Sequence, residues 1–452
     1  MTIASSRATS GQPAVIPAGA PEFAQACQAF NLAVDQRPQE VAHPADAGEV
    51  AALVRRAREQ GLRVAAQRTG HGAQALDWER PALLLRTDRM LGAEIDAGAR
   101  KARVNAGVRW DDIVDDLSGQ GLAALHGSAR DICIAGYSLG GGQGWLGRKH
   151  GLQASSVTAI ELVTADGELV RADRDSEPEL FWALRGGGGN FGVVTAIEFD
   201  LYPLAELYAG ALLYPFERGD EVLHAWRELT ADVPEEITSV FKLLQLPDLP
   251  EIPDPVRGKS FAVVTAAVLG DEADGADFLE PVRRLGPAMD TFGMVPPVAL
   301  SYLAMDPEDP LPYTSSHHLM SELPAEAVDT LIEVGGAGSG SPLVMIELRH
   351  LGGALARREP HHGAYAAMDG EYNLFSLGGI LAPEDAPVMI EAADRVAAAM
   401  EPWRSGWYLN FVERQFDMSQ VFDAETWRRL QAVKAQVDPD GVFAGNHEIP
   451  LP

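Results

Sequence analysis

The chain has few cysteines and few basic residues, and both shortages narrow the range of possible functions. Only Cys27 and Cys133 occur among 452 residues, which excludes a disulfide framework and a cysteine-rich metal site. The 36 Lys and Arg residues are outnumbered by 65 Asp and Glu residues, giving a formal net charge of -29. Nucleic acids and anionic membranes need clustered cationic surface, and no basic run is present. We therefore expect neither as a partner, and the scarcity of cysteine fits a cytoplasmic chain.

Long apolar runs are also missing. No run approaches the roughly 20 residues that a bilayer-spanning helix needs. The N-terminal segment is rich in Ala, Ser, Gly and Pro but lacks the basic start and apolar core of a signal peptide, so we predict a flexible leader over residues 1–25. A length of 452 residues exceeds a single ordinary core, which predicts more than one domain.

The spacing of apolar residues predicts two halves of different architecture. In the first half, a helical pattern at 50–57 precedes strand patterns at 62–66, 82–85, 102–106, 157–163 and 193–199. Beyond about residue 208, strand patterns at 238–245, 260–269, 343–350 and 407–411 are separated by helical patterns at 271–285 and 384–400. Around Glu347 apolar and polar residues alternate, which predicts a sheet with one face on helices and the other toward a cavity.

Three Gly-rich runs, at 66–73, 139–145 and 185–192, indicate one extended, phosphate-containing ligand. His71 lies in the first run, where an imidazole is either a cofactor contact or an ordinary turn residue. Gly142, Gly144 and Gly147 match the pattern G-x-G-x-x-G of nicotinamide-binding Rossmann domains. The residues that follow are too short and Gly-interrupted for the long helix of that fold, which disfavours it.

The order of these motifs resembles the berberine bridge enzyme-like branch of the vanillyl-alcohol oxidase and p-cresol methylhydroxylase (PCMH) flavoproteins. The matching segments are 69–71, 95–96, 106–110, 126–128, 135–142, 145–152, 161–167, 180–194, 352–354, 408–411 and 443–450. The resemblance implies an α+β fold, with a bipartite FAD-binding domain of two α/β subdomains and a substrate domain whose antiparallel sheet is covered by helices. It places the FAD domain at 26–205, the substrate domain at 206–405 and a C-terminal return to the FAD domain at 406–452.

The resemblance also implies how FAD is held. The flavin would be bonded covalently through His71 only, because Ala129 stands where some relatives carry a second linking Cys; a noncovalent contact at His71 is the alternative. Arg68 would reach the pyrophosphate or face solvent, and Cys133 is expected to be a small buried residue. Ile132 does not decide whether O₂ or another molecule accepts the electrons. The implied cofactor-binding residues are Gln67, Arg68, Thr69, Gly70, His71, Gly72, Ala73, Gly127, Ser128, Ile132, Gly136, Tyr137, Gly140, Gly141, Gly142, Gly144, Trp145, Val194, Asn410 and Asn446.

Two residues are candidates for the catalytic base. Tyr408 matches the tyrosine of the family's Tyr-x-Asn element and is otherwise an aromatic packing residue. Glu347 is a second base or a structural ion pair with Arg349. The pairs His317–His318 and His361–His362 lack metal-ligand spacing, so we expect surface pairs and no metal. The expected lining of the substrate cavity comprises Phe241, Leu243, Tyr302, Tyr313, Glu347, Tyr372 and Phe375.

Together these implications predict an FAD-dependent oxidase. It would take a hydride from an alcohol, amine or phenolic carbon of a small organic molecule, with a secondary metabolite favoured over a sugar, and pass the electrons to O₂ as H₂O₂. The alternatives are a dehydrogenase with another acceptor, a flavoprotein that only sequesters a metabolite, and a nicotinamide reductase.

Overall fold

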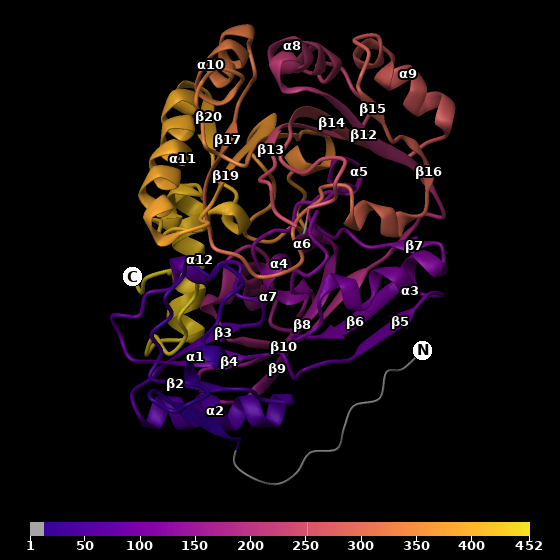
Figure 1. Ribbon diagram of the computed structural model, residues 1–452. Helices are drawn as coiled ribbons and strands as arrows, with labels where there is room; N and C mark the ends of the chain where they lie inside the picture. Colours follow the sequence, from indigo (N-terminus) through magenta and orange to yellow (C-terminus); the bar gives the residue numbers. More distant parts are fainter. Residues whose placement is uncertain (1–12, 251) are drawn as a thin grey trace.

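Residues 13–250 and 252–452, as described by a computed structural model, form two small sheets and one large sheet (Figure 1). The first small sheet consists, in spatial order, of β1 (Val15–Pro17), β2 (Glu40–Ala42), β4 (Ala82–Arg86) and β3 (Arg63–Gln67). Strands β2 and β3 both run parallel to β4, and α2 (Ala47–Glu59) connects them. Asp46 begins α2 by accepting a hydrogen bond from the Glu49 amide at 2.9 Å.

The second small sheet is antiparallel throughout. Its strands are, in spatial order, β5 (Ala93–Asp96), β6 (Lys101–Asn105), β10 (Val193–Asp200), β8 (Val157–Val163) and β9 (Leu169–Asp173). The short helices of this half are α1 (Phe23–Ala26), α3 (Val114–Gly119), α4 (Ile134–Leu139), α5 (Gly147–His150), α6 (Gln153–Ser156) and α7 (Pro178–Leu184). A two-stranded ribbon pairs β7 (Leu122–Ala123) with β11 (Tyr202–Pro203). The C-terminal helix α12 (Ala424–Val437) packs into the same core, since Leu430 and Val433 join Phe181 and Ile197 there.

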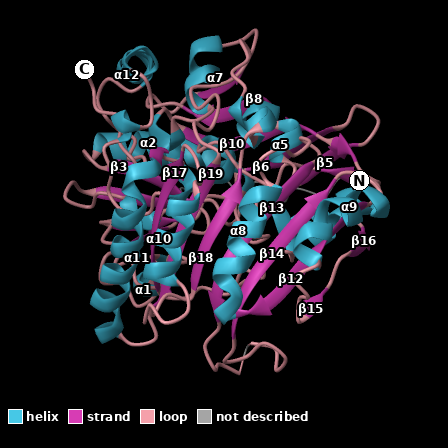
Figure 2. Cartoon of the chain, turned by 90° about the horizontal axis from the view of Figure 1, so that it is seen from above, coloured by secondary structure: helices cyan, strands magenta, loops and turns pink. Residues whose placement is uncertain are grey.

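The large antiparallel sheet fills the upper half of Figure 1. Its strands are, in spatial order, β15 (Met289–Asp290), β12 (Leu207–Pro215), β14 (Ser260–Val268), β13 (Ile237–Gln245), β18 (Met345–His350), β19 (Tyr372–Gly379), β17 (Tyr313–Met320) and β20 (Arg404–Gly406), with β16 (Gly293–Val295) beside β12. Its outer face is covered by α8 (Gly219–Leu229), α9 (Glu272–Arg283), α10 (Ala325–Gly335) and α11 (Ala386–Met400), as Figure 2 shows. The inner face is directed toward the two small sheets.

This arrangement confirms the predicted α+β class. In β18, Ile346 and Leu348 join the apolar core under the helices, so Glu347 and Arg349 lie on the inner face, as the alternation predicts. The predicted domain boundaries stay predictions. The leader was expected over 1–25; residues 1–12 lie outside the described chain, and Val15–Pro17 already pairs with β2. Among the described residues no helix has the length and apolarity needed to cross a bilayer.

Three expectations for the second half are wrong. Residues 407–411 are not a strand: Leu409–Phe411 forms a 3₁₀ turn, because side chains rather than a neighbouring strand hold this segment. His317 and His318 are buried, 5% and 1% exposed, instead of forming a surface pair. Both lie on β17. The residues that flank them in the sequence do not indicate that both faces of this strand are buried.

The expected cavity lining is also partly wrong. Phe241 and Leu243 pack under the helices, because the alternation in β13 turns Lys242 inward instead, and Tyr372 of β19 packs there too. Tyr302 lies outside the sheet with 51% of its surface exposed.

Candidate functional site

The loop after β3 holds His71 on three sides. The imidazole stacks on Phe30, with ring centroids 3.8 Å apart and an interplanar angle of 18°. Its Nδ1 lies 2.9 Å from the Thr69 hydroxyl, and its Nε2 lies 3.4 Å from Oδ2 of Asp131. Gly70 permits this loop because its φ is +85° and a Cβ there would lie 3.0 Å from the backbone of Ala29. The sequence therefore fixes the imidazole in one orientation.

Burial controls the charge of this pair. It lowers the pKa of His71 to about 3, so the imidazole is neutral at neutral pH. Burial raises the pKa of Asp131 to about 6, although hydrogen bonding to the backbone and the charge of Arg109 lower it. A neutral imidazole keeps a free lone pair, which is the form able to act as a nucleophile.

The second Gly-rich run, in the first half of the chain, contacts Asn410 in the second half. Gly141 and Gly142 have φ values of +111° and +82° after the end of α4. A Cβ on Gly140 would lie 1.8 Å from Oδ1 of Asn410, and one on Gly142 would lie 2.7 Å from the Tyr137 ring. Only glycine allows these approaches.

Tyr408 lies next to this run and is 1% exposed. Its hydroxyl accepts hydrogen bonds from the backbone N–H of Gln143 at 2.7 Å and from the Asn410 amide at 3.0 Å. Its own backbone N–H donates to Nε2 of His317 at 2.8 Å. Burial raises the pKa of Tyr408 to about 12, while these two hydroxyl contacts and the charge of Arg349 lower it. The group is thus a phenol whose donors favour the phenolate form.

A row of directly opposed residues crosses the inner face of the large sheet. Lys242 of β13 is opposite Glu347 of β18, which is opposite Phe375 of β19, which is opposite His317 of β17. Because residues in one row share a face, this row connects the charged pair to the histidine that holds Tyr408.

The charged part of this row, Lys242, Glu347 and Arg349, is called the sheet cluster below. Nζ of Lys242 lies 3.0 Å from Oε2 of Glu347, and Arg349 bonds the other oxygen. Burial raises the pKa of Glu347, but the charges of Arg349 and Lys242 outweigh it and hold that pKa below its usual range. A carboxylate held by two cations is a weak base, which favours the ion-pair interpretation of Glu347. Arg349 also donates to the Ser128 hydroxyl at 3.2 Å.

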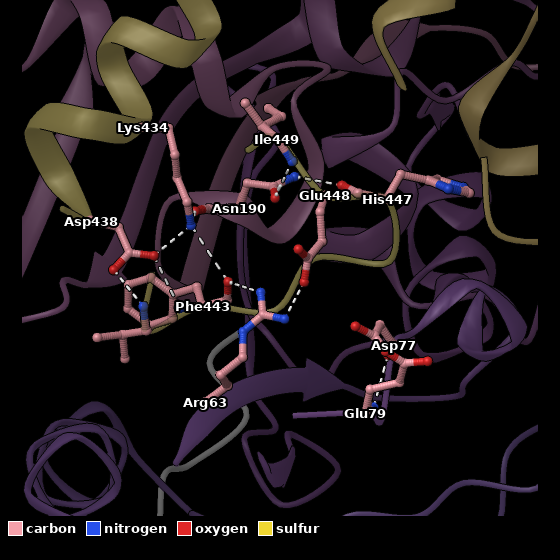
Figure 3. A network of polar contacts seen from close by, with 11 residues as sticks. Arg63, Asp77, Glu79, Asn190, Lys434, Asp438, Phe443, His447, Glu448 and Ile449 are labelled. Atoms are coloured by element: carbon pink, nitrogen blue, oxygen red, sulfur yellow. Dashed lines mark hydrogen bonds and ion pairs between the residues drawn. The ribbon is translucent and has the colours of Figure 1, made fainter. Parts of the chain in front are cut away.

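The third Gly-rich run is tied to the C-terminal segment (Figure 3). Asn190 donates to the His447 carbonyl and accepts from the Ile449 amide. Lys434 of α12 reaches the Asn190 carbonyl at 2.7 Å and also bonds Asp438, while Arg63 of β3 bonds Glu448. We call Arg63, Lys434, Asp438 and Glu448 the C-terminal cluster.

Asn446 lies in the segment that the C-terminal cluster holds in place, and it contacts the His71 loop. A Cβ on Gly72 would lie 2.3 Å from Nδ2 of Asn446, so a larger residue at this position would displace the Asn446 side chain. This contact brings together two predicted cofactor-binding residues that are far apart in the sequence.

Other predicted cofactor-binding residues occupy the same region or the core beneath it. Arg68 donates to the Gly107 carbonyl at 2.9 Å instead of facing solvent. Gln67 bonds Gln36 and Arg86 through its side chain. Ala73 and Val194 are buried, Trp145 packs in an apolar cluster with Leu207 against the large sheet, and Ile132 lies beside the core. Cys133 is buried, and its thiol contacts the Ala106 carbonyl at 3.2 Å.

The region fits an extended polar cofactor. Both side-chain amide atoms of Gln153 are buried without a partner among the described residues, and Gln153 lies next to Gly142. Gly136 has no heavy atom within 4 Å of the position of a Cβ, which leaves space beside α4. Unpartnered buried polar groups beside an open glycine surface suit the carbonyl, amide and phosphate groups of FAD.

The structure adds site residues that the sequence interpretation missed. Asp131, Lys242 and His317 each contact a predicted residue from another element. Their signal is non-local, because each depends on which strands and loops meet in space. A possible metal-binding group within the described chain, Asp220, His224 and Asp329, lies on α8 and α10 at the outer face, away from this region.

Comparison with known proteins gives a consistent result. A family model for an FAD binding domain matches residues 38–173. Chitooligosaccharide oxidase of Gibberella zeae is 26% identical over 454 residues, covering 93% of this chain and 89% of that protein. (R)-6-hydroxynicotine oxidase of Paenarthrobacter nicotinovorans is 38% identical over 169 residues, covering 37% of each chain. The solved structure of BBE-like 1 from Physcomitrella patens superposes with a TM-score of 0.85 at 18% identity over 98% of both chains, which shows a shared fold.

Proposed function

We propose that this chain, which carries an FAD-binding domain and is similar to FAD-linked oxidoreductases, is a berberine bridge enzyme-like oxidase of a small aromatic substrate. In this proposal His71 carries the only covalent bond to FAD, and Tyr408 is the base that takes a proton from the substrate O–H or N–H. Glu347 holds Arg349 rather than acting as a base. Electrons pass to O₂, which gives H₂O₂.

The observation that carries the proposal is the environment of the Tyr408 hydroxyl. Two donors reach its oxygen, from Gln143 and Asn410, and no described residue accepts its own proton. An oxygen with two donors and a nearby guanidinium is arranged to stabilise a phenolate. Tyr408 also lies at the junction of the Gly-rich run and the large sheet, between the proposed cofactor and substrate regions.

Bound FAD would supply a two-electron acceptor at N5 of its ring. The residues that would hold it are His71 at one end, the Gly140–Gly142 backbone beside Tyr408, and the Gly72–Asn446 contact. Glycine lets backbone N–H groups approach carbonyl and phosphate oxygens without obstruction.

The inner face favours an aromatic substrate. Phe375 and Phe411 lie with ring centroids 4.8 Å apart, and Arg349 lies over the Phe411 ring at 5.0 Å. Aromatic side chains offer faces for stacking, and a guanidinium beside them suits a phenolic or carboxylate oxygen. We therefore favour a phenol, aromatic alcohol or aromatic amine over an oligosaccharide, and we place the protein in the cytoplasm, where both free cysteines, Cys27 and Cys133, stay reduced.

The first test is the visible spectrum of the purified protein before and after acid precipitation, with His71→Ala alongside. We expect yellow colour to stay in the wild-type pellet and to leave the pellet of the variant. Colour released from both proteins would retain FAD but contradict the bond through His71. A colourless protein that FAD does not reconstitute would contradict the whole proposal.

The second test separates the oxidase from its alternatives. We expect substrate-dependent oxygen uptake with formation of H₂O₂ when aromatic alcohols, amines and phenols are screened beside chitooligosaccharides. Reduction of a dye without oxygen uptake would instead show a dehydrogenase. A flavin that no substrate bleaches under anaerobic conditions would leave a protein that only binds its ligand, and bleaching by NADPH alone would indicate a reductase.

A further inference from the structure

Asp131 is a buried carboxyl group, and the only basic side chain within salt-bridge distance of it among the described residues is the neutral imidazole of His71. The Asp131 side chain is 6% exposed, and the nearby Arg109 pairs with Asp111 at 3.0 Å instead. Burying an ionisable carboxyl group without a cation is unfavourable. Since no ion pair compensates this cost, the position of Asp131 needs another explanation.

The contacts of the imidazole supply that explanation. Nδ1 of His71 faces the Thr69 hydroxyl at 2.9 Å, and Nε2 faces Oδ2 of Asp131 at 3.4 Å. A carboxylate at Nε2 favours the tautomer with the proton on Nε2, which leaves the lone pair on Nδ1. The stacking on Phe30 prevents the ring from turning away. In a Ser-His-Asp triad the carboxylate likewise holds one nitrogen of the histidine, and the other nitrogen acts as the base.

We propose that Asp131 is the positioning residue for attachment of the flavin, orienting His71 and taking the proton from its Nε2 as Nδ1 forms the bond. This inference rests on the proposed covalent link through His71. The new N–C bond replaces one C–H bond of the flavin 8α-methyl group. The two hydrogens lost, one from the imidazole and one from the methyl group, leave with two electrons that O₂ accepts, giving one H₂O₂. The Thr69 hydroxyl has to release Nδ1 in this step.

The surroundings of Asp131 allow the proton to leave. Asp131 lines a cavity of about 50 Å³, together with Ala129, Arg130, Ser301 and Tyr302. A cavity of that size holds a water molecule, which can exchange the proton with solvent. Within the described chain, the ionisable groups around Asp131 are His71, Arg109, Asp111, Arg130, Tyr302, Asp306, Glu308 and Tyr313.

The test measures the rate of covalent attachment separately from FAD binding. Protein from flavin-starved cells is mixed with FAD, and acid-stable flavin is followed with time for the wild type, Asp131→Asn, Asp131→Glu and the control Asp254→Asn, whose carboxylate is 86% exposed in a surface pair with Arg257. We expect Asp131→Asn to attach FAD about 10²-fold more slowly, the size typical of a lost general base, with unchanged noncovalent affinity. Asp131→Glu should recover part of the rate, and Asp254→Asn should match the wild type.

The pH dependence distinguishes proton transfer from a structural role. In the wild type the attachment rate should rise as the pH passes through about 6, where Asp131 ionises, and this step should be missing in Asp131→Asn. Equal rates in the wild type and Asp131→Asn would overturn the inference, as would a slow variant that keeps the wild-type pH step. If the wild type itself released all its FAD in acid, the proposed bond through His71 would fail instead. Melting temperatures show whether each variant is folded.

Discussion

The C-terminal cluster and the sheet cluster, which are buried apart from the exposed Glu448, differ in their balance of charge. The C-terminal cluster has two cations, Arg63 and Lys434, against two carboxylates, Asp438 and Glu448. The sheet cluster has two cations, Lys242 and Arg349, against the single carboxylate of Glu347. The first therefore carries no net charge, whereas the second leaves one positive charge in excess on the inner face of the sheet.

The two clusters also differ in the groups that they contact. Asp438 accepts from the backbone amides of Val442 and Phe443, and Lys434 donates to backbone carbonyls, so this cluster fixes the course of the chain. Arg349 instead reaches the Ser128 hydroxyl and the Phe411 ring, next to Tyr408. A balanced cluster bonded to the backbone stabilises the fold, whereas an unbalanced one beside a phenol favours a negative charge there. Four variants can break or sharpen this comparison.

The largest effect is expected for Asp438→Asn. Removing one partner of a buried ion pair leaves Lys434 uncompensated, which should lower the free energy of unfolding by about 3–5 kcal/mol. Denaturant unfolding measures this loss. Glu179→Gln is the control, because Glu179 forms an exposed pair with Arg429 and its loss should cost at most about 1 kcal/mol. Equal losses in both variants would contradict the structural role of the C-terminal cluster.

Glu347→Gln should cost less, about 3 kcal/mol, because Arg349 keeps its bond to Ser128. The excess positive charge beside Tyr408 would rise and lower the pKa of Tyr408, so the rising limb of the activity–pH profile, where the base ionises, should move to lower pH. The profile of kcat against pH measures this shift. If kcat were abolished at every pH in a folded variant, Glu347 would be a base after all.

Tyr408→Phe tests the phenol directly. Loss of a general base typically lowers kcat by about 10²-fold or more, while FAD stays bound. Stability should fall by about 1–3 kcal/mol, because the buried N–H of Gln143 loses its acceptor. Tyr365→Phe is the matched control, since its hydroxyl donates only to the Trp407 carbonyl. Unchanged kcat in Tyr408→Phe would remove the base from the proposal.

The smallest effect concerns Glu413, an acid in the loop that follows Leu409–Phe411. Burial raises the pKa of Glu413 to about 7, although Ser315 and Tyr313 lower it. Between about pH 4.5 and 7 the folded chain holds a proton that the unfolded chain has released, so stability falls as pH rises through this window. Glu413→Gln should flatten that part of the stability–pH curve. Thermal melts across the range would show an unchanged slope if Glu413 ionised normally.

The difference between local patterns and contacts of distant segments explains which features the sequence predicts. His71 and Thr69 lie two residues apart, and each Gly-rich run is a local pattern, so short stretches of sequence are enough to predict them. The alternation in β18 also places Glu347 on the inner face correctly. These features depend on strand period and on glycine conformations, which the sequence carries directly.

Other features depend on the pairing of distant strands and loops. Lys242 meets Glu347 only because β13 lies beside β18, and Asp131 meets His71 only because two loops converge. The 407–411 segment has an apolar, β-forming composition, yet contacts to His317 and Gln143 hold it as a turn. Tertiary contacts thus override local propensity where the site is assembled.

The edge strand β3 is completed by the end of the described chain. The Val64 amide donates to the Val442 carbonyl, and the Ala444 amide donates to the Val64 carbonyl, forming a parallel bridge beside β3. During synthesis this edge stays open until residues 442–444 have emerged from the ribosome. The first sheet is therefore finished only after every strand of the large sheet has been made, although its own strands are made first, and until then its exposed edge is a site for mispairing with other chains.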